Sequence, residues 1–181
     1  MYGIVNKSIE ELIVSQFGQS TWEQVLATSG IEVDFFISSE PYDDAITYRL
    51  ATAAAEVLGI TLEQVLHAFG EFWILKTGKE KYGGLMEAGG TSLRDFLEQL
   101  PVFHNRVMLV YPRLTPPEFK VSNASESSID IHYHSHRQGL QEFVRGLLQG
   151  LSRLYDTPVD ITLLQSRAAG DTHETFRVSW Q

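Results

Sequence analysis

The first part of the chain repeats apolar residues at helical spacing. Between Val5 and Phe17 they recur every three or four positions, which is the period of one helix face, and Gly18 follows as a typical helix end. Similar patterns predict further helices in the segments 20–30, 42–59, 61–78, 92–100 and 101–112. We therefore expect a helical lobe over about residues 1–112.

Capping residues predict where some of these helices begin. Ser20 is followed three positions later by Glu23, and Thr61 by Gln64, which is the spacing of a capping box. Pro101 fits the first turn of a helix, because backbone N–H groups there have no hydrogen-bond partner within the helix and proline lacks this group. A new helix is therefore expected to start at Pro101.

The pattern changes from helical to alternating after the helical part. The prolines between residues 112 and 117 restrict the backbone and predict a rigid connector. Alternating apolar and polar residues then predict strands at 118–122, 128–137, 159–166 and 174–180, with a helix over 140–155. We expect a single α+β domain over residues 1–181. Its mixed lobe, about 113–181, would hold an antiparallel sheet and one long helix, and the cleft between the lobes would suit a ligand.

Composition excludes several classes of function. The net charge of −9 argues against nucleic acid or an anionic membrane as a partner, since phosphate contacts need a basic surface. The chain has no Cys, which excludes disulfides, thiolate catalysis and thiolate metal sites. It also lacks an apolar run of about 18 residues, the length of a membrane-spanning helix. These features fit a cytoplasmic protein.

Polar side chains interrupt an apolar face of the strand predicted at 128–137. Ile129 and Ile131 lie on one face, and Tyr133, Ser135 and Arg137 continue that face at every second position. Two hydroxyls and a guanidinium match a carboxylate ligand. A buried, unpaired arginine would be costly, so an anion is expected there.

Two kinds of anion would satisfy Arg137. One is an external carboxylate, and the other is one of the protein's own acids, such as Asp130 or Glu142. The opposite face carries three alternating histidines, expected on the solvated outer face of an edge strand rather than at a metal: His132, His134 and His136. His67 and His173 have no partners nearby in sequence and are interpreted as surface or structural residues.

His104 interrupts an apolar helix face formed by Leu97, Leu100, Val107, Met108 and Tyr111. The commoner explanation is a core histidine bonded to a backbone carbonyl. The alternative is a metal ligand. Zinc would need further ligands that the surrounding sequence does not offer. A lone axial histidine in an apolar pocket suits a heme. The two heme propionates would then be the carboxylates expected at Arg137.

With His104, the segment "YPRLTPPEF" and the segment "YHSHR" together, the chain resembles the heme–nitric oxide/oxygen binding (H-NOX) family. That family includes the heme domain of the beta subunit of soluble guanylate cyclase and bacterial gas sensors. The resemblance implies heme b, iron protoporphyrin IX, buried between the lobes with His104 as the metal ligand. It also implies that Tyr133, Ser135 and Arg137 bind the propionates and that Pro117 presses the porphyrin out of plane.

The distal side of the heme is expected to favour nitric oxide. Relatives that hold O2 carry a distal tyrosine, and the corresponding position here is Phe143, which has no donor. Trp73 is the one plausible donor on that side. The resemblance therefore implies a sensor of NO and CO that is not an enzyme. The alternatives are an O2 sensor using Trp73, a peroxidase-type heme enzyme, and a heme-free interaction module.

The output of such a sensor is expected on another polypeptide or on a removed downstream segment, because the chain ends where the sensor fold ends. The resemblance implies a histidine kinase, a cyclic-dinucleotide enzyme or a guanylate cyclase as partner. The expected signal is rupture of the His104–iron bond by NO, followed by flattening of the heme.

Overall fold

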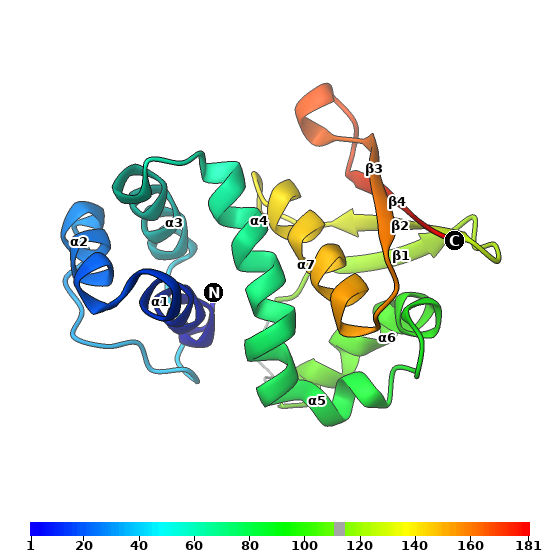
Figure 1. The fold of residues 1–181 in the computed structure, drawn as a ribbon, viewed down its shortest axis with the longest axis horizontal. Helices are drawn as coiled ribbons and strands as arrows, with labels where there is room; N and C mark the ends of the chain where they lie inside the picture. The colour runs from blue at the N-terminus through cyan, green and yellow to red at the C-terminus, as the bar shows by residue number, and fades with distance from the viewer. Residues whose placement is uncertain (111–114) are drawn as a thin grey trace. The chain divides into compact units, whose positions relative to one another are not determined.

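The computed structural model describes residues 1–110 and 115–181 (Figure 1). The chain forms two compact units, Met1–Phe69 and Gly70–Gln181. The sequence placed the boundary between lobes near residue 112, whereas the contacts group the later helices with the sheet. Tyr111 and the first part of the proline connector lie outside the described residues.

The first unit contains α1 (Gly3–Phe17), α2 (Gln19–Ser29), α3 (Asp44–Leu58) and most of α4 (Leu62–Phe72). The apolar stripes of α1, α2 and α3 supply its core: Ile9, Leu12, Val25, Leu50 and Ala54. The predicted ends of α1 at Gly18, α2 at Gly30 and α3 at Gly59 are confirmed.

One of the two predicted capping boxes is present. The Gln64 N–H donates to Thr61 Oγ1 at 3.2 Å, and the Thr61 N–H donates to Gln64 Oε1 at 2.9 Å. The box at Ser20 was wrong, because α2 begins one residue earlier and Gly18, which has no side chain, is its N-cap.

The second unit begins with a continuous helical segment that changes its winding. The end of α4 passes into a π-helix, η1 (Trp73–Gly78), and then into α5 (Lys79–Glu87). Wider π turns are rare and occur often at functional sites. The helical period predicted this segment only as far as Gly78, without its change of winding.

The expected helix break at Pro101 was wrong. A single helix, α6 (Leu93–Val110), runs through this proline. An interior proline costs about 3 kcal/mol because it removes one hydrogen bond and crowds the carbonyl one turn earlier. Burial of one side of α6 offsets that cost, and the residues it buries are Leu93, Phe96, Leu97, Leu100 and Val107.

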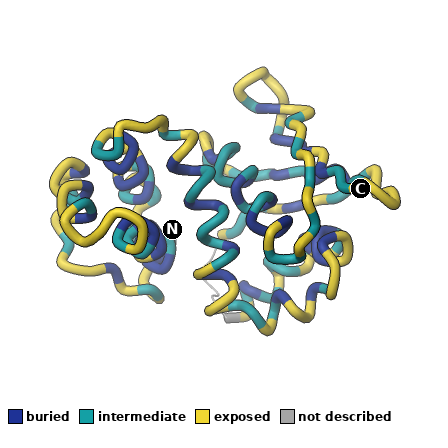
Figure 2. Tube along the Cα trace, in the orientation of Figure 1, coloured by how far each residue is buried: buried dark blue, intermediate teal, exposed yellow. Residues whose placement is uncertain are grey.

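Four antiparallel strands form one sheet in the order β1-β2-β4-β3. They are β1 (Glu118–Ser122), β2 (Ser128–His134), β3 (Val159–Gln165) and β4 (Glu174–Trp180). The helices α6 and α7 (Gln141–Leu154) pack against the apolar face of this sheet (Figure 1). The inward side chains of β2 and β4 are among the most deeply buried: Ile129, Ile131, Phe176 and Val178. Figure 2 shows this burial along the middle strands.

The strand β2 differs from its prediction in two respects. It ends at His134, because its pairing with β1 ends at Glu118 and its pairing with β4 ends at Glu174. Ser135 and Arg137 therefore follow the strand instead of continuing its face. In addition, β2 is an interior strand, and β1 and β3 are the edges of the sheet.

No single helix among the described residues is long and apolar enough to cross a membrane.

Candidate functional site

The helix α6 places His104 beside the first strand of the sheet. Its imidazole stacks on the Phe119 ring of β1, with centroids 5.2 Å apart and planes 25° apart. Phe103 contacts it edge-on, with a centroid distance of 5.7 Å. Leu97, Leu100 and Val107 of the predicted face are buried. The apolar surroundings expected for this histidine are therefore present.

The His104 imidazole is neutral at physiological pH. Burial lowers its pKa to about 4, and the backbone carbonyl of Leu100 opposes that effect. That carbonyl is not in hydrogen-bond geometry: Nδ1 is buried and has no hydrogen-bond partner within residues 1–110 and 115–181. A structural core histidine would have such a partner. A neutral imidazole is the form of histidine that binds metals.

A pocket of about 680 Å³ opens beside His104. Its lining includes Pro101, Met108, Pro116, Pro117 and Phe119. These residues are apolar, as expected for the walls of a cofactor pocket, and Asn105, Glu118 and Lys120 add polar groups to the lining. The pocket thus brings together His104, which the resemblance assigns to the iron, and Pro117, which it assigns to the porphyrin.

Among the described residues, no group of three or more His, Asp or Glu side chains could hold a metal ion. A metal at His104 would therefore need most of its ligands from outside the protein. A porphyrin supplies four such nitrogens. The imidazole, with its Nδ1 buried, and the adjoining pocket fit a heme better than a bare ion.

Tyr133 is connected to His104 through Phe119. Phe119 and Tyr133 are paired across β1 and β2, and their ring centroids lie 5.4 Å apart. Tyr133 is 3% exposed, and burial raises the pKa of its phenol. The hydroxyl of Tyr133 therefore remains protonated and able to donate a hydrogen bond.

Ser135 and Arg137 lie in the turn that follows β2. Ser135 Oγ accepts the Arg137 backbone N–H at 3.1 Å, and Arg137 Nη1 donates to the Thr115 carbonyl at 3.0 Å. The expectation that Arg137 lies on a buried strand face was wrong, because the strand ends before it and its side chain is partly exposed. The turn nevertheless follows directly after the strand that carries Tyr133.

The two acids considered as partners of Arg137 bind other arginines. Asp130 accepts two hydrogen bonds of 2.8 Å from Arg177, and Glu142 accepts one of 3.1 Å from Arg145. Each of these carboxylates thus has an arginine partner other than Arg137.

Sequence reasoning missed Arg167 and Glu174. Arg167 donates to both carboxylate oxygens of Glu174 at 2.9 Å and to the carbonyls of Ser135 and Arg137. About thirty residues separate Arg167 from this turn, so no local pattern could have indicated the contact. Only the pairing of the strands brings them together.

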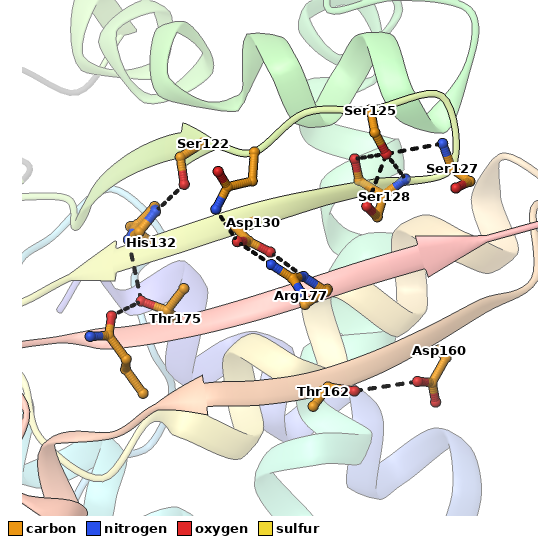
Figure 3. Close-up of polar contacts among 12 residues, drawn as sticks. Ser122, Ser125, Ser127, Ser128, Asp130, His132, Asp160, Thr162, Thr175 and Arg177 are labelled. Carbon is orange, nitrogen blue, oxygen red and sulfur yellow. Dashed lines mark hydrogen bonds and ion pairs between the residues drawn. The ribbon is translucent and has the colours of Figure 1, made fainter.

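The three histidines expected on a solvated edge do not form one surface. His132 lies in the polar network of the outer sheet face, 2.7 Å from Ser122 Oγ and 3.2 Å from Thr175 Oγ1 (Figure 3). His173, whose partners are distant in sequence, stacks on His134 with ring centroids 4.0 Å apart, and its Nε2 lies 3.0 Å from His132 Nδ1. His136 is exposed after the end of β2.

The distal candidates lie on two helices that cross closely. A Cβ added at Gly70 would lie 2.2 Å from the carbonyl oxygen of Phe143. Trp73 follows Gly70 by three residues at the start of the π-helix, and both Trp73 and Phe143 are partly buried. The close crossing is therefore possible only with glycine at position 70.

Comparison with protein families gives a match to Haem-NO-binding (HNOB) over residues 2–163. The chain belongs to this family. The predicted resemblance to H-NOX domains is confirmed, and with it the relation to heme-binding gas sensors. The family is a sensor domain and not a catalytic one.

The curated relatives of this H-NOX chain include soluble guanylate cyclases of Caenorhabditis elegans. Gcy-31 is 27% identical over 165 residues, which are 91% of this chain and 24% of the relative. Gcy-32 is 31% identical over 178 residues, which are 96% of this chain and 26% of the relative. The chain thus spans about a quarter of the length of these cyclases.

Solved H-NOX structures share the fold. An H-NOX protein from S. oneidensis in the Fe(II)NO ligation state has a TM-score of 0.89 at 20% identity, covering 100% of this chain and 99% of that one. Fe(II) unliganded H-NOX from K. algicida has a TM-score of 0.86 at 19% identity, covering 100% and 97%. The predicted α+β class, helices with an antiparallel sheet, is confirmed.

Proposed function

We propose that this H-NOX chain is a sensor of NO and CO that binds them at the ferrous iron of heme b. The observation that carries the proposal is His104, a neutral imidazole with a buried, unpartnered nitrogen among the described residues, beside an apolar pocket. The absorption spectrum of the purified protein tests it. A strong Soret band is expected, and its absence after incubation with heme would favour a heme-free interaction module.

The residues present fit a heme in three ways. His104 would bind the iron, and Pro117 would contact the porphyrin from the same pocket. Tyr133, Ser135 and Arg137 would bind the propionates, because hydroxyls and a guanidinium donate strong hydrogen bonds to carboxylates. The heme itself would supply the iron at which a diatomic gas binds.

Arg137→Ala is expected to weaken heme binding. A charge-assisted hydrogen bond to a carboxylate contributes on the order of 1.5–3 kcal/mol, and this variant removes it. Titration of the heme-free protein with heme measures the loss. His136→Ala, one residue earlier and exposed, is the matched control and should bind heme as the unmodified protein does. Equal losses in both variants would argue against a propionate at Arg137.

The ferrous protein is expected to bind NO and CO but to remain unliganded in air. Bound O2 carries partial negative charge and needs a donor, which Phe143 does not provide, whereas NO and CO depend less on one. Phe143→Tyr should introduce a donor and begin to stabilise an O2 complex, measured as a shift of the visible spectrum in air. A stable O2 complex of the unmodified protein would instead point to an O2 sensor with Trp73 as donor.

The signal would reach a separate output protein or domain. Because the curated relatives are guanylate cyclases, a cyclase is one candidate partner, and a histidine kinase or a cyclic-dinucleotide enzyme is another. We place the protein in the cytoplasm, as the word soluble in the relatives' names suggests. The switch would be rupture of the His104–iron bond, which changes the contacts of α6 with the cofactor.

A further inference from the structure

Arg167, from a distant part of the chain, bonds the backbone of the turn that carries Ser135 and Arg137. Arg167 Nη1 donates to the Ser135 carbonyl at 2.7 Å, and Nη2 donates to the Arg137 carbonyl at 2.9 Å. The two accepting residues belong to the proposed propionate site. Arg167 thus bonds the backbone carbonyls of these two residues.

This turn has little support from the sheet. The strand β2 ends at His134, so no ladder hydrogen bond fixes the residues that follow. Gly139 has a φ of 73°, a left-handed conformation that lets the chain turn toward α7. The planar fork of an arginine can bond two carbonyls and a carboxylate at once. Arg167 thus bonds the backbone of the turn, as the pairing of neighbouring strands bonds the backbone of Tyr133.

Arg167 is itself bonded to a buried carboxylate. Its Nε lies 2.9 Å from both oxygens of Glu174, which is 4% exposed. It starts a short 3₁₀ helix, η2 (Arg167–Ala169). Ser166, just before it, donates its hydroxyl to Gln141 Oε1 at 2.9 Å and its N–H to Asp171 Oδ2 at 2.8 Å. The guanidinium is therefore anchored to β4 through Glu174.

We propose that Arg167 is a positioning residue for the propionate site: its guanidinium sets the backbone of Ser135 and Arg137 so that their side chains meet the heme carboxylates. This inference rests on the proposed heme function. It assigns a role to a residue outside the Tyr-x-Ser-x-Arg segment, with Glu174 as its anchor.

Two variants of Arg167 distinguish the effect of its hydrogen-bond geometry from the effect of its positive charge. Arg167→Lys keeps the positive charge, but a single ammonium cannot bond Glu174 and both carbonyls together. Arg167→Gln removes the charge as well. Arg177→Gln is the matched control, since Arg177 forms a similar two-bond pair with Asp130 on the same sheet but does not contact the turn.

Two measurements are made on all three variants. Heme titration of the heme-free protein should show a roughly tenfold or greater loss of affinity for both Arg167 variants, the size typical of losing a residue that orients a ligand-binding group. Amide hydrogen exchange, measured without heme, should become faster at Arg137, whose N–H is bonded to Ser135 Oγ, in these two variants. The control should change neither quantity, even where its melting temperature falls.

Three results would overturn the inference. Wild-type affinity in Arg167→Lys would mean that only the charge matters. An equal loss of affinity in Arg177→Gln would mean general destabilisation. Faster exchange with unchanged affinity would mean that the turn does not control binding.

If the unmodified protein took up no heme, the proposed function would fail, and exchange at Arg137 would still decide whether Arg167 orders the turn. Arg167→Lys decides the case if Arg167→Gln does not fold.

Discussion

His104→Gly is expected to lose almost all heme from the purified protein. The imidazole is the one protein ligand proposed for the iron, and glycine leaves a space of its size in the helix. Added imidazole should occupy that space and restore heme binding. The heme-to-protein ratio and the ferrous absorption spectrum, with and without imidazole, measure the result.

The control for this variant is Leu109→Gly on the same helix. Leu109 is 83% exposed, so its replacement repeats the helix cost of glycine, about 1 kcal/mol, with little loss of core packing. It should keep its heme. Unchanged heme content and an unchanged spectrum in His104→Gly would reject His104 as the ligand.

The period of the apolar residues was sufficient to predict most of the fold. It identified α1, α3, α7 and all four strands, because each buries one face against a neighbour and repeats its apolar residues accordingly. It failed at Pro101, where local preference predicts a break. The burial of Leu97 and Leu100 beside that proline is a tertiary effect, which no local pattern contains.

The candidate site was predictable by residue type but not by geometry. His104 and Tyr133 lie within regular elements, so their faces followed from periodicity. Ser135 and Arg137 lie beyond the last residue of β2 that has a pairing partner, and the end of pairing depends on strands that are distant in sequence. Arg167 could not be found for the same reason. Its contacts depend on the connection between β3 and β4, which the sequence leaves undefined.

A row of aromatic contacts joins the proposed iron ligand to the proposed propionate site. His104 on α6 stacks on Phe119 of β1, and Phe119 contacts Tyr133 of β2. Pro117 lies two residues before Phe119 and lines the same pocket as His104. A displacement of His104 would therefore change its contacts with the segment that carries Pro117 and Phe119.

The NO complex is expected to be five-coordinate, with His104 released from the iron. NO weakens the bond on the opposite side of the heme, and a switch requires a contact that is present in one state and absent in the other. CO should leave His104 bound and produce less than the full signal. The absorption and electron paramagnetic resonance spectra of the NO complex give the coordination number.

Pro117→Ala extends this prediction to the protein side of the switch. Pro117 is expected to hold the porphyrin out of plane while His104 binds the iron, so the smaller alanine should let the heme flatten without NO. Resonance Raman bands sensitive to porphyrin planarity should then shift toward those of the unmodified NO complex. Pro116→Ala, which alters the neighbouring proline of the same pocket, is the matched control and should shift them less. A six-coordinate NO complex that retains His104 would defeat the rupture mechanism, even if Pro117→Ala flattened the heme.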